Sequence, residues 1–271
     1  MPNTTKVFED SPDFVQSLAR GLSVVRAFDR GHARMTLSKV AERTGLTRAV
    51  VRRNLLTLQH LGYVGADGRD FYLRPRVLDL GYSYLSSLGL GEIALQAMEE
   101  LSHRVGESCS MAVLDETDIV YVARVPVRRV MSIALGVGAR LPAFATSMGR
   151  VLLAAMDDAE LDAWTAANRF YAITEHTLHK PAAWRAEIAR VRRDGHAIVA
   201  QELELGLCSV AVPVHANGRV VAGLNVGMAY SSGVRDRARK LVLPVLRRTS
   251  ESIERTLARS GWLPAATSRR A

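Results

Sequence analysis

The chain has few of the residues that mark secreted or metal-binding proteins. Its two cysteines, Cys109 and Cys208, exclude a disulfide framework and a ligand cluster of the CxxC type. No apolar run approaches the ~18 residues that a membrane span needs, and the N-terminus lacks a secretory pattern. We therefore predict a cytoplasmic protein without a membrane partner, metal or cofactor.

Catalytic motifs are also missing. The sequence has no GxSxG elbow and no P-loop, and no HExxH-type spacing connects the histidines at 103, 176, 179, 196 and 215. A pair of Cys208 with a distant histidine stays open as an alternative, although a small buried cysteine is the commoner case. We predict no catalytic residue and no enzyme activity, which a turnover assay would test.

Basic residues, in contrast, are concentrated near the N-terminus. The formal net charge is +9, and residues 17–76 hold twelve Lys/Arg against four Asp/Glu, a difference of +8. A basic segment of this kind attracts polyanions, nucleic acid foremost. A solvated surface is the alternative that charge alone leaves open.

The same segment has the layout of a winged helix-turn-helix. A first helix is predicted from the spacing of Leu18, Leu22, Val25 and Phe28. A second is predicted from its N-cap Thr36 to Gly45, with Leu37, Val40 and Ala41 inward. Thr47 is the predicted N-cap of a third helix with an apolar stripe of Val51, Leu55 and Leu58. A hairpin with its turn at 65–68 follows. Two helices joined by a tight turn and followed by a hairpin are typical of DNA-binding domains.

The third helix has a basic outer face at its start. A projection at 100° per residue places Ala49 and Arg53 opposite Val51, with Arg52 beside them. Together with Arg48 at the helix start, they form the predicted outward face. Arginine binds guanine O6 and N7 bidentately or clamps a phosphate, and alanine contacts a thymine methyl. We predict Arg48 and Arg52 as base readers, Arg53 and Thr47 as phosphate contacts, and Arg69 at the hairpin tip as a groove or phosphate contact.

The remainder reads as a linker helix followed by an α+β domain with an antiparallel sheet. The helix over 76–88 has an apolar side of Leu78, Tyr82, Leu85 and Leu88, suited to dimer contact. Strands are predicted over 109–116, 119–125, 130–138, 196–202, 209–215 and 219–228, the last two joined at Asn217-Gly218, and helices over 147–156, 159–168, 182–195 and 234–257. The predicted domains are a flexible arm (1–13), the winged domain (14–75), the linker helix (76–90), an effector domain (91–260) and a tail (261–271).

Three strings in the first third of the chain, 17-SLARGLSVVRAF-28, 36-TLSKVAERTGLTRAVVRRNLLTLQHLGYV-64 and 77-VLDLGYSYL-85, resemble the IclR family of bacterial transcriptional regulators. The strings 119-IVYVARVP, 145-ATSMGRVLLA and 201-QELELGLCSVAVPV extend the likeness to residues 14–258. It is greatest to the aromatic-catabolism subgroup, the regulators of protocatechuate and 4-hydroxybenzoate genes.

The resemblance implies a winged helix-turn-helix, a linker helix and a GAF-like effector domain. It also implies homodimers, or homotetramers that are dimers of dimers, on operator DNA. The effector implied is a small organic acid, with protocatechuate, 4-hydroxybenzoate and β-ketoadipate as candidates. A regulator that answers to glyoxylate, a sugar acid or a multidrug ligand is the alternative.

Effector residues are predicted partly from the family pattern and partly from chemistry. The pattern places Ser147, Met148, Ser209 and Asn225 at the pocket, whereas Cys208 stands where the family usually has a basic residue. Arg124 is a candidate carboxylate clamp because guanidinium binds that group bidentately, and strand alternation puts it on the face opposite Tyr121. Adaptable apolar walls are expected from Met131 and Met148, a surface loop at Arg128 and Arg129, and a solvated or subunit-contacting edge at Glu202 and Glu204.

Overall fold

The computed structural model describes residues 8–127 and 135–263. The chain divides into two compact units, Met1–Tyr84 and Leu85–Ala271, and the division falls inside helix α5 (Leu78–Leu88). The domain limits predicted from the sequence therefore stay predictions. Within the described ranges, no helix combines the length and apolar character that a membrane crossing requires.

The first unit contains the predicted helices with their predicted caps. Its elements are α2 (Gln16–Arg26), β1 (Arg34–Thr36), α3 (Leu37–Thr44), α4 (Arg48–His60), β2 (Val64–Asp67), β3 (Asp70–Leu73) and the 3-10 turn η1 (Pro75–Val77) before α5. The Thr36 and Thr47 side chains accept the backbone N–H groups of Lys39 and Val50, so each caps the helix that follows. Gly45 ends α3 at φ 69°, a left-handed position that suits glycine.

A three-stranded sheet of order β1-β3-β2 forms the wing. The predicted hairpin is present, but its turn is narrower than 65–68, because Asp67 pairs with Asp70 and leaves only Gly68 and Arg69 between them. Gly65 is a strand residue, where a Cβ would lie 2.4 Å from Cζ of Tyr72. Strand β1 was not predicted, since three residues carry too little pattern to show a strand.

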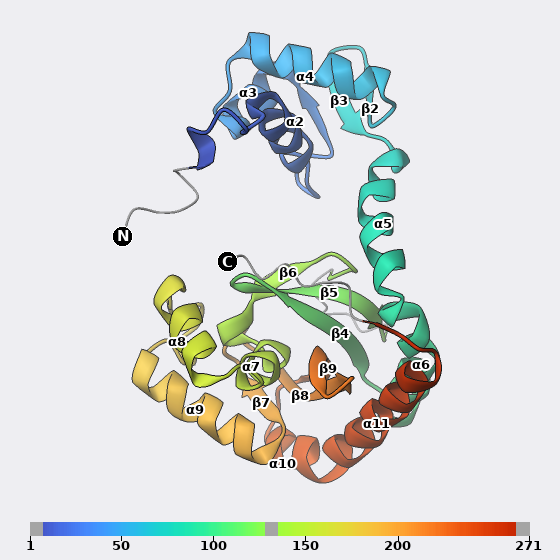
Figure 1. The fold of residues 1–271 in the computed structure, drawn as a ribbon, viewed down its shortest axis with the longest axis vertical. Coiled ribbons are helices and arrows are strands. Elements are labelled where there is room, and N and C mark those ends of the chain that lie inside the picture. Colours follow the sequence, from blue (N-terminus) through green and yellow to red (C-terminus); the bar gives the residue numbers. More distant parts are fainter. Residues whose placement is uncertain (1–7, 128–134, 264–271) are drawn as a thin grey trace. The chain divides into compact units, whose positions relative to one another are not determined.

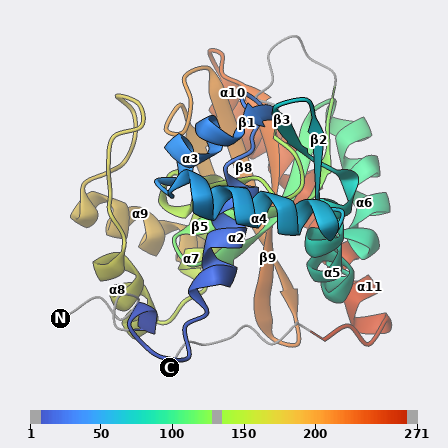
Figure 2. The ribbon, with the colours of Figure 1, turned by 90° about the horizontal axis from the view of Figure 1, so that it is seen from above.

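The core of this unit contradicts the predicted face of the first helix. Val24 and Phe28 are buried, whereas Leu18 and Leu22 are 61% and 49% exposed. Helix α2 packs across α4 (Figure 2) on a face that includes Gly21, whose missing Cβ would lie 3.3 Å from Oδ1 of Asn54. A glycine allows that close approach, which an apolar count cannot show.

The second unit is built on one six-stranded sheet of order β6-β5-β4-β9-β8-β7, which is antiparallel as predicted, although its strand order was not predicted. Its strands are β4 (Ser108–Asp115), β5 (Asp118–Val125), β6 (Arg140–Pro142), β7 (Ala197–Ala200), β8 (Leu207–Ala216) and β9 (Arg219–Ala229). The strand predicted over 130–138 is wrong in its described part, since 135–138 form a turn before β6. Asn217 and Gly218, at φ 51° and 73°, make the expected tight turn between β8 and β9.

Helices cover both faces of this sheet (Figure 1). One face packs against α6 (Leu90–Val105) and the C-terminal run of α10 (Val234–Arg237), the π-helical segment Ala238–Val242 and α11 (Leu243–Arg259). The other face packs against the 3-10 turn η2 (Ala143–Ala145), α7 (Ser147–Ala154), α8 (Asp158–Ala167) and α9 (Pro181–Asp194). Both cores are apolar, and the polar side chains of the α7 face gather at one end of it, where the cavity described below lies.

Candidate functional site

The start of α4 presents an exposed basic face. Val51 and Leu55 are fully buried, so the opposite side of the helix, with Arg48, Arg52 and Arg53, faces solvent. Thr47 and Ala49 are exposed at the same end. The structure therefore brings five of the six predicted DNA-contacting residues onto one surface.

The arginines of this face differ from their neighbours in having no partner in the part of the chain that the structure describes. Within the described residues, Arg48, Arg52, Arg53 and the wing-tip Arg69 make no side-chain hydrogen bond or ion pair. In contrast, Arg43 is held 2.6 Å from the Asp29 carboxylate and Arg34 2.7 Å from Asp67. Unpaired guanidinium groups are free to bind a polyanion without first breaking a contact.

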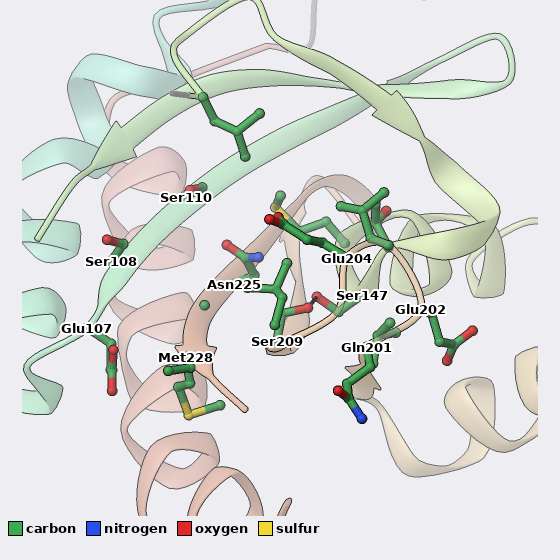
Figure 3. A pocket seen from close by; sticks show the side chains of 18 of the residues that line it. Glu107, Ser108, Ser110, Ser147, Gln201, Glu202, Glu204, Ser209, Asn225 and Met228 are labelled. Carbon is green, nitrogen blue, oxygen red and sulfur yellow. Dashed lines mark hydrogen bonds between the residues drawn. The ribbon is translucent and has the colours of Figure 1, made fainter. Parts of the chain in front are cut away.

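A cavity of about 530 Å³ opens at the α7 face of the six-stranded sheet (Figure 3). Strands β4, β5, β8 and β9 form its floor, and the start of α7 and the 201–207 segment form its walls. Five of the six predicted effector residues line it: Arg124, Ser147, Met148, Ser209 and Asn225. Met131, with Arg128 and Arg129, lies outside the described residues.

A bulge in β5 decides where Arg124 points. Met111 pairs with Ala123 and Ala112 pairs with Tyr121, which leaves Val122 without a partner on β4. Strict alternation would put Tyr121 and Arg124 on opposite faces, but the extra residue places both on the cavity side. The sequence expectation for this pair is therefore wrong, since a bulge has no reliable sequence mark.

Arg124 lies in a cross-strand row of polar side chains. Its Nη1 donates to Oγ of Ser110, 3.1 Å away, and Ser110 pairs in turn with Asn225 on β9. Among the described residues, Oδ1 of Asn225 has no hydrogen-bond partner although the side chain is buried. Burial raises the pKa of the Tyr121 phenol, against the opposing charge of Arg124, so a neutral hydroxyl faces the cavity.

The start of α7 supplies a second polar region. Thr146 caps the helix by accepting the Gly149 N–H at 3.0 Å, and the next hydroxyl, that of Ser147, lies 2.8 Å from Oγ of Ser209 on β8. Met148 is 1% exposed and lines the cavity near Gly223 on β9. The cavity thus offers polar groups at two positions together with apolar surface, a combination suited to a small functionalised ligand.

A buried ion pair ties α7 to the 201–207 segment, and sequence reasoning missed it. Arg150 is 1% exposed, and its two terminal nitrogens donate to the Glu202 carboxylate at 2.9 and 2.5 Å. Glu202 also accepts the Leu178 N–H at 2.9 Å, while the Thr177 hydroxyl donates to its carbonyl. Glu202 is therefore not the solvated edge that was expected, although Glu204 is exposed. The one available signal was a charged residue within the apolar run of α7.

Both cysteines lie away from this cavity. Cys208 is fully buried in the cluster on the α6 and α11 face of the sheet, and burial raises the pKa of its thiol. Burial likewise raises the pKa of Cys109 to about 12. In the ranges 8–127 and 135–263, no group of three or more metal-binding side chains occurs.

Comparison with known proteins identifies the chain's family. A family model described as the C-terminal domain of the bacterial transcriptional regulator IclR matches residues 82–255, and one described as the IclR helix-turn-helix domain matches residues 17–68. The chain belongs to the IclR family. This membership confirms the resemblance and the fold class predicted from the sequence.

Three relatives within the IclR family are informative. The Pca regulon regulatory protein of Pseudomonas putida is 44% identical over 92% of this chain and 86% of its own length. A crystal structure described as that of a transcriptional regulator from Rhodococcus sp. RHA1 is 50% identical, with a TM-score of 0.81 over 91% of this chain and 100% of its own. A double mutant of the inducer-binding domain of the Acinetobacter PobR transcription factor, in complex with 3-hydroxybenzoic acid, is 29% identical, with a TM-score of 0.56 over 60% of this chain and 97% of its own. Their names describe transcriptional regulators rather than enzymes.

Proposed function

We propose that this IclR-family chain is a ligand-responsive transcriptional regulator of genes for aromatic-acid catabolism. The observation that carries the proposal is the cavity, in which Arg124 and a hydroxyl pair flank apolar walls. The likeness to a Pca regulon regulator and to a PobR domain that holds a hydroxybenzoate supports the same ligand class. Neither relative by itself assigns an effector to this chain.

The DNA-binding part of the proposal rests on α4 and the wing. We assign base reading to Arg48 and Arg52, a thymine contact to Ala49, and phosphate contacts to Thr47, Arg53 and the wing-tip Arg69. A recognition helix presents its first turns to base edges, and Arg48, Arg52 and Arg53 lie there without side-chain partners among the described residues. Their exposure is what such a role requires.

The effector part assigns one end of the ligand to Arg124. A carboxylate can form two hydrogen bonds to the guanidinium, which Ser110 already holds at 3.1 Å. Met148 and Tyr121 offer apolar surface for a ring, and Ser147 with Ser209 offers hydroxyls for its far substituent. A hydroxybenzoate has these groups, and β-ketoadipate has two carboxylates for the same two regions.

The response is proposed to depend on a homodimer or a dimer of dimers. Helix α5 leaves Leu78 and Tyr82 73% and 64% exposed, as a contact between copies requires. Effector binding would change the geometry of paired effector domains, and α5 would carry that change to the spacing of the winged domains. The effector shifts this equilibrium only through its different affinity for the two arrangements.

A sugar acid is the second candidate effector. Several hydroxyl-bearing or amide side chains line the cavity, including Ser108, Ser110, Ser209 and Asn225, and such groups favour a polyhydroxy ligand. Three of these hydroxyls already have protein partners: Ser108 accepts the Val127 N–H, Ser110 accepts from Arg124, and Ser209 pairs with Ser147. This occupancy favours the aromatic acid, because fewer groups remain for extra hydroxyls.

A catalytic role is not proposed. The thiol of Cys208 lies on the sheet face opposite the cavity, and its raised pKa opposes the thiolate that a nucleophile needs. Incubation of purified protein with each candidate acid should leave the acid unchanged.

The test of the proposed function is fluorescence anisotropy on the DNA upstream of the chain's own gene. Binding is measured across a salt series, with random DNA as control and with protocatechuate, 4-hydroxybenzoate, β-ketoadipate or a sugar acid added. We expect specific, salt-sensitive binding that one aromatic-pathway acid alters. Specific binding that only the sugar acid alters would make a sugar acid, and not an aromatic acid, the effector of this regulator. No preference over random DNA would refute the role of α4.

A further inference from the structure

Gly227 stands at an unusual place in the cavity floor. It lies in the interior of β9, where it pairs with Ser108 on β4 and with Ser209 on β8. All three residues line the cavity. Among the residues that the structure describes, a Cβ built on Gly227 would have no atom within 4 Å. At this point β9 contributes only backbone to the cavity floor, between the hydroxyls of Ser108 and Ser209 on the two neighbouring strands.

The protein itself does not require a glycine at this position. Glycine weakens a strand interior, so it is usually explained by a positive φ or by a neighbour that leaves no room for a side chain. Gly227 has neither in the described part of the chain, since its φ lies outside the left-handed region and no described atom occupies its Cβ position. Gly223, four residues earlier in the same strand, shows the ordinary reason, because its Cβ would lie 3.0 Å from Cβ and 3.1 Å from the carbonyl oxygen of Met148.

The surroundings indicate what could occupy the open space. With strands about 4.8 Å apart and two residues spanning about 6.7 Å, the Cα atoms of Gly227 and Ser110 lie roughly 8 Å apart. Oγ of Ser110 holds the Arg124 guanidinium at 3.1 Å. A benzoate whose carboxylate binds Arg124 would place its ring over Gly227 when the ring points toward Ser108 and not toward Tyr121. A flat ring can lie in van der Waals contact on bare backbone, which a thicker, tetrahedral sugar cannot match.

We propose that Gly227 is a specificity-determining residue of this chain, the seat on which the planar ring of an aromatic carboxylic acid rests. The inference deepens the proposed function and depends on it. The missing side chain sets the depth of the cavity, and the hydroxyls of Ser108 and Ser209 border the ring on the neighbouring strands. Any side chain at 227 would occupy the volume that the ring needs.

The test substitutes the seat in the full-length chain and measures binding by titration calorimetry. Gly227→Ala and Gly227→Val are compared with the unaltered protein, with 4-hydroxybenzoate and protocatechuate as probes. One added methyl should weaken binding about tenfold, and valine at least about a hundredfold, as overpacking of a fitted space predicts. Thermal unfolding of both variants should be unchanged or shifted upward, because the Cβ meets no atom of the described residues 8–127 and 135–263.

Gly223→Ala is the matched contrast on the same strand. Its Cβ contacts Met148, so this variant should unfold at a lower temperature than the unaltered chain. Operator binding is also measured without ligand. Gly227 lies in the effector cavity and not on α4, so Gly227→Val should bind the operator as the unaltered chain does.

Each other outcome overturns the inference. Unaltered affinity for both probes in Gly227→Val would show that no ring rests there, and unfolding of Gly227→Ala would show that the protein itself needs the glycine. If the unaltered chain binds neither probe but responds to another acid, the aromatic ligand class of the proposed function fails and the seat fails with it. If the unaltered chain binds the probes and both variants bind them with the same affinity, the proposed function stands without the seat.

Discussion

The buried pair of Arg150 and Glu202 allows a sharp prediction about stability. Glu202→Gln keeps the shape of the side chain but removes the charge that the Arg150 guanidinium faces at 2.9 and 2.5 Å. Arg150 is 1% exposed, so water cannot replace the lost partner. Removing one member of a buried pair costs about 3–5 kcal/mol. We expect about 3 kcal/mol, the low end, because the Glu187 carboxylate remains 3.7 Å from Arg150.

Thermal unfolding followed by circular dichroism measures this effect. A loss of about 3 kcal/mol lowers the midpoint of a unit of this size by about 6–12 °C. The matched control is Glu204→Gln, the same chemical change two residues away at an exposed position, which should stay within about 0.5 kcal/mol of the unaltered protein. The ligand affinity of Glu202→Gln should also fall, because Glu202 ties the 201–207 wall to α7.

A second variant separates lost charge pairing from lost packing. Arg150→Met combined with Glu202→Leu removes both charges, and it should unfold at a higher temperature than Glu202→Gln. The reasoning is refuted if Glu202→Gln and Glu204→Gln unfold at the same temperature. That result would mean that the Arg150 charge is neutralised without Glu202.

Three further predictions concern DNA, ligand and pH. Arg52→Ala should reduce the free energy of operator binding by about 1–3 kcal/mol through one base position and relax the preference for the base at that position, as measured on a set of single-base operator variants. An equal loss of affinity on every sequence would make Arg52 a phosphate contact. Arg124→Ala should retain operator binding and lose the acid response, and unchanged ligand affinity would remove Arg124 from the site. For Glu187, burial raises the pKa, but the Arg190 hydrogen bond and the charges of Arg150 and Arg190 outweigh it and lower the pKa below 4.5. The ionised Glu187 carboxylate therefore stabilises the folded state above its unfolded-state pKa, and this stabilisation is lost as the pH falls through the lowered folded-state pKa. Glu187→Gln should reduce the free energy of unfolding at pH 7 and reduce it less at pH 3. Urea unfolding at the two pH values measures both effects.

Local rules were sufficient for much of the DNA-binding unit. Caps at Thr36 and Thr47, the left-handed Gly45 and the buried stripe of α4 each depend on residues within one or two turns of the chain. The outward basic face follows from helical periodicity alone. The first helix was oriented wrongly because its buried face depends on the approach of Gly21 to Asn54, a contact across 33 positions that no local pattern contains.

The ligand pocket shows the opposite balance. The family pattern directed attention to Ser147, Ser209 and Asn225, which line one cavity. The side of the sheet on which Arg124 lies depended on the bulge at Val122, and the role of Glu202 depended on Arg150, 52 positions away. Neither the bulge nor the ion pair changes the local sequence pattern of its residues, so neither could be predicted from that pattern.

The strings that resemble the IclR family determined the family from the sequence alone. The helices of the DNA-binding unit, the antiparallel domain and the basic face of α4 followed from periodicity, caps and charge along the chain. Only the tertiary structure decided which side chains share the cavity, which charges are paired and which glycine has open space above it. Those properties depend on strand register and on contacts between distant segments, where a shift of one residue moves a side chain to the other face of the sheet.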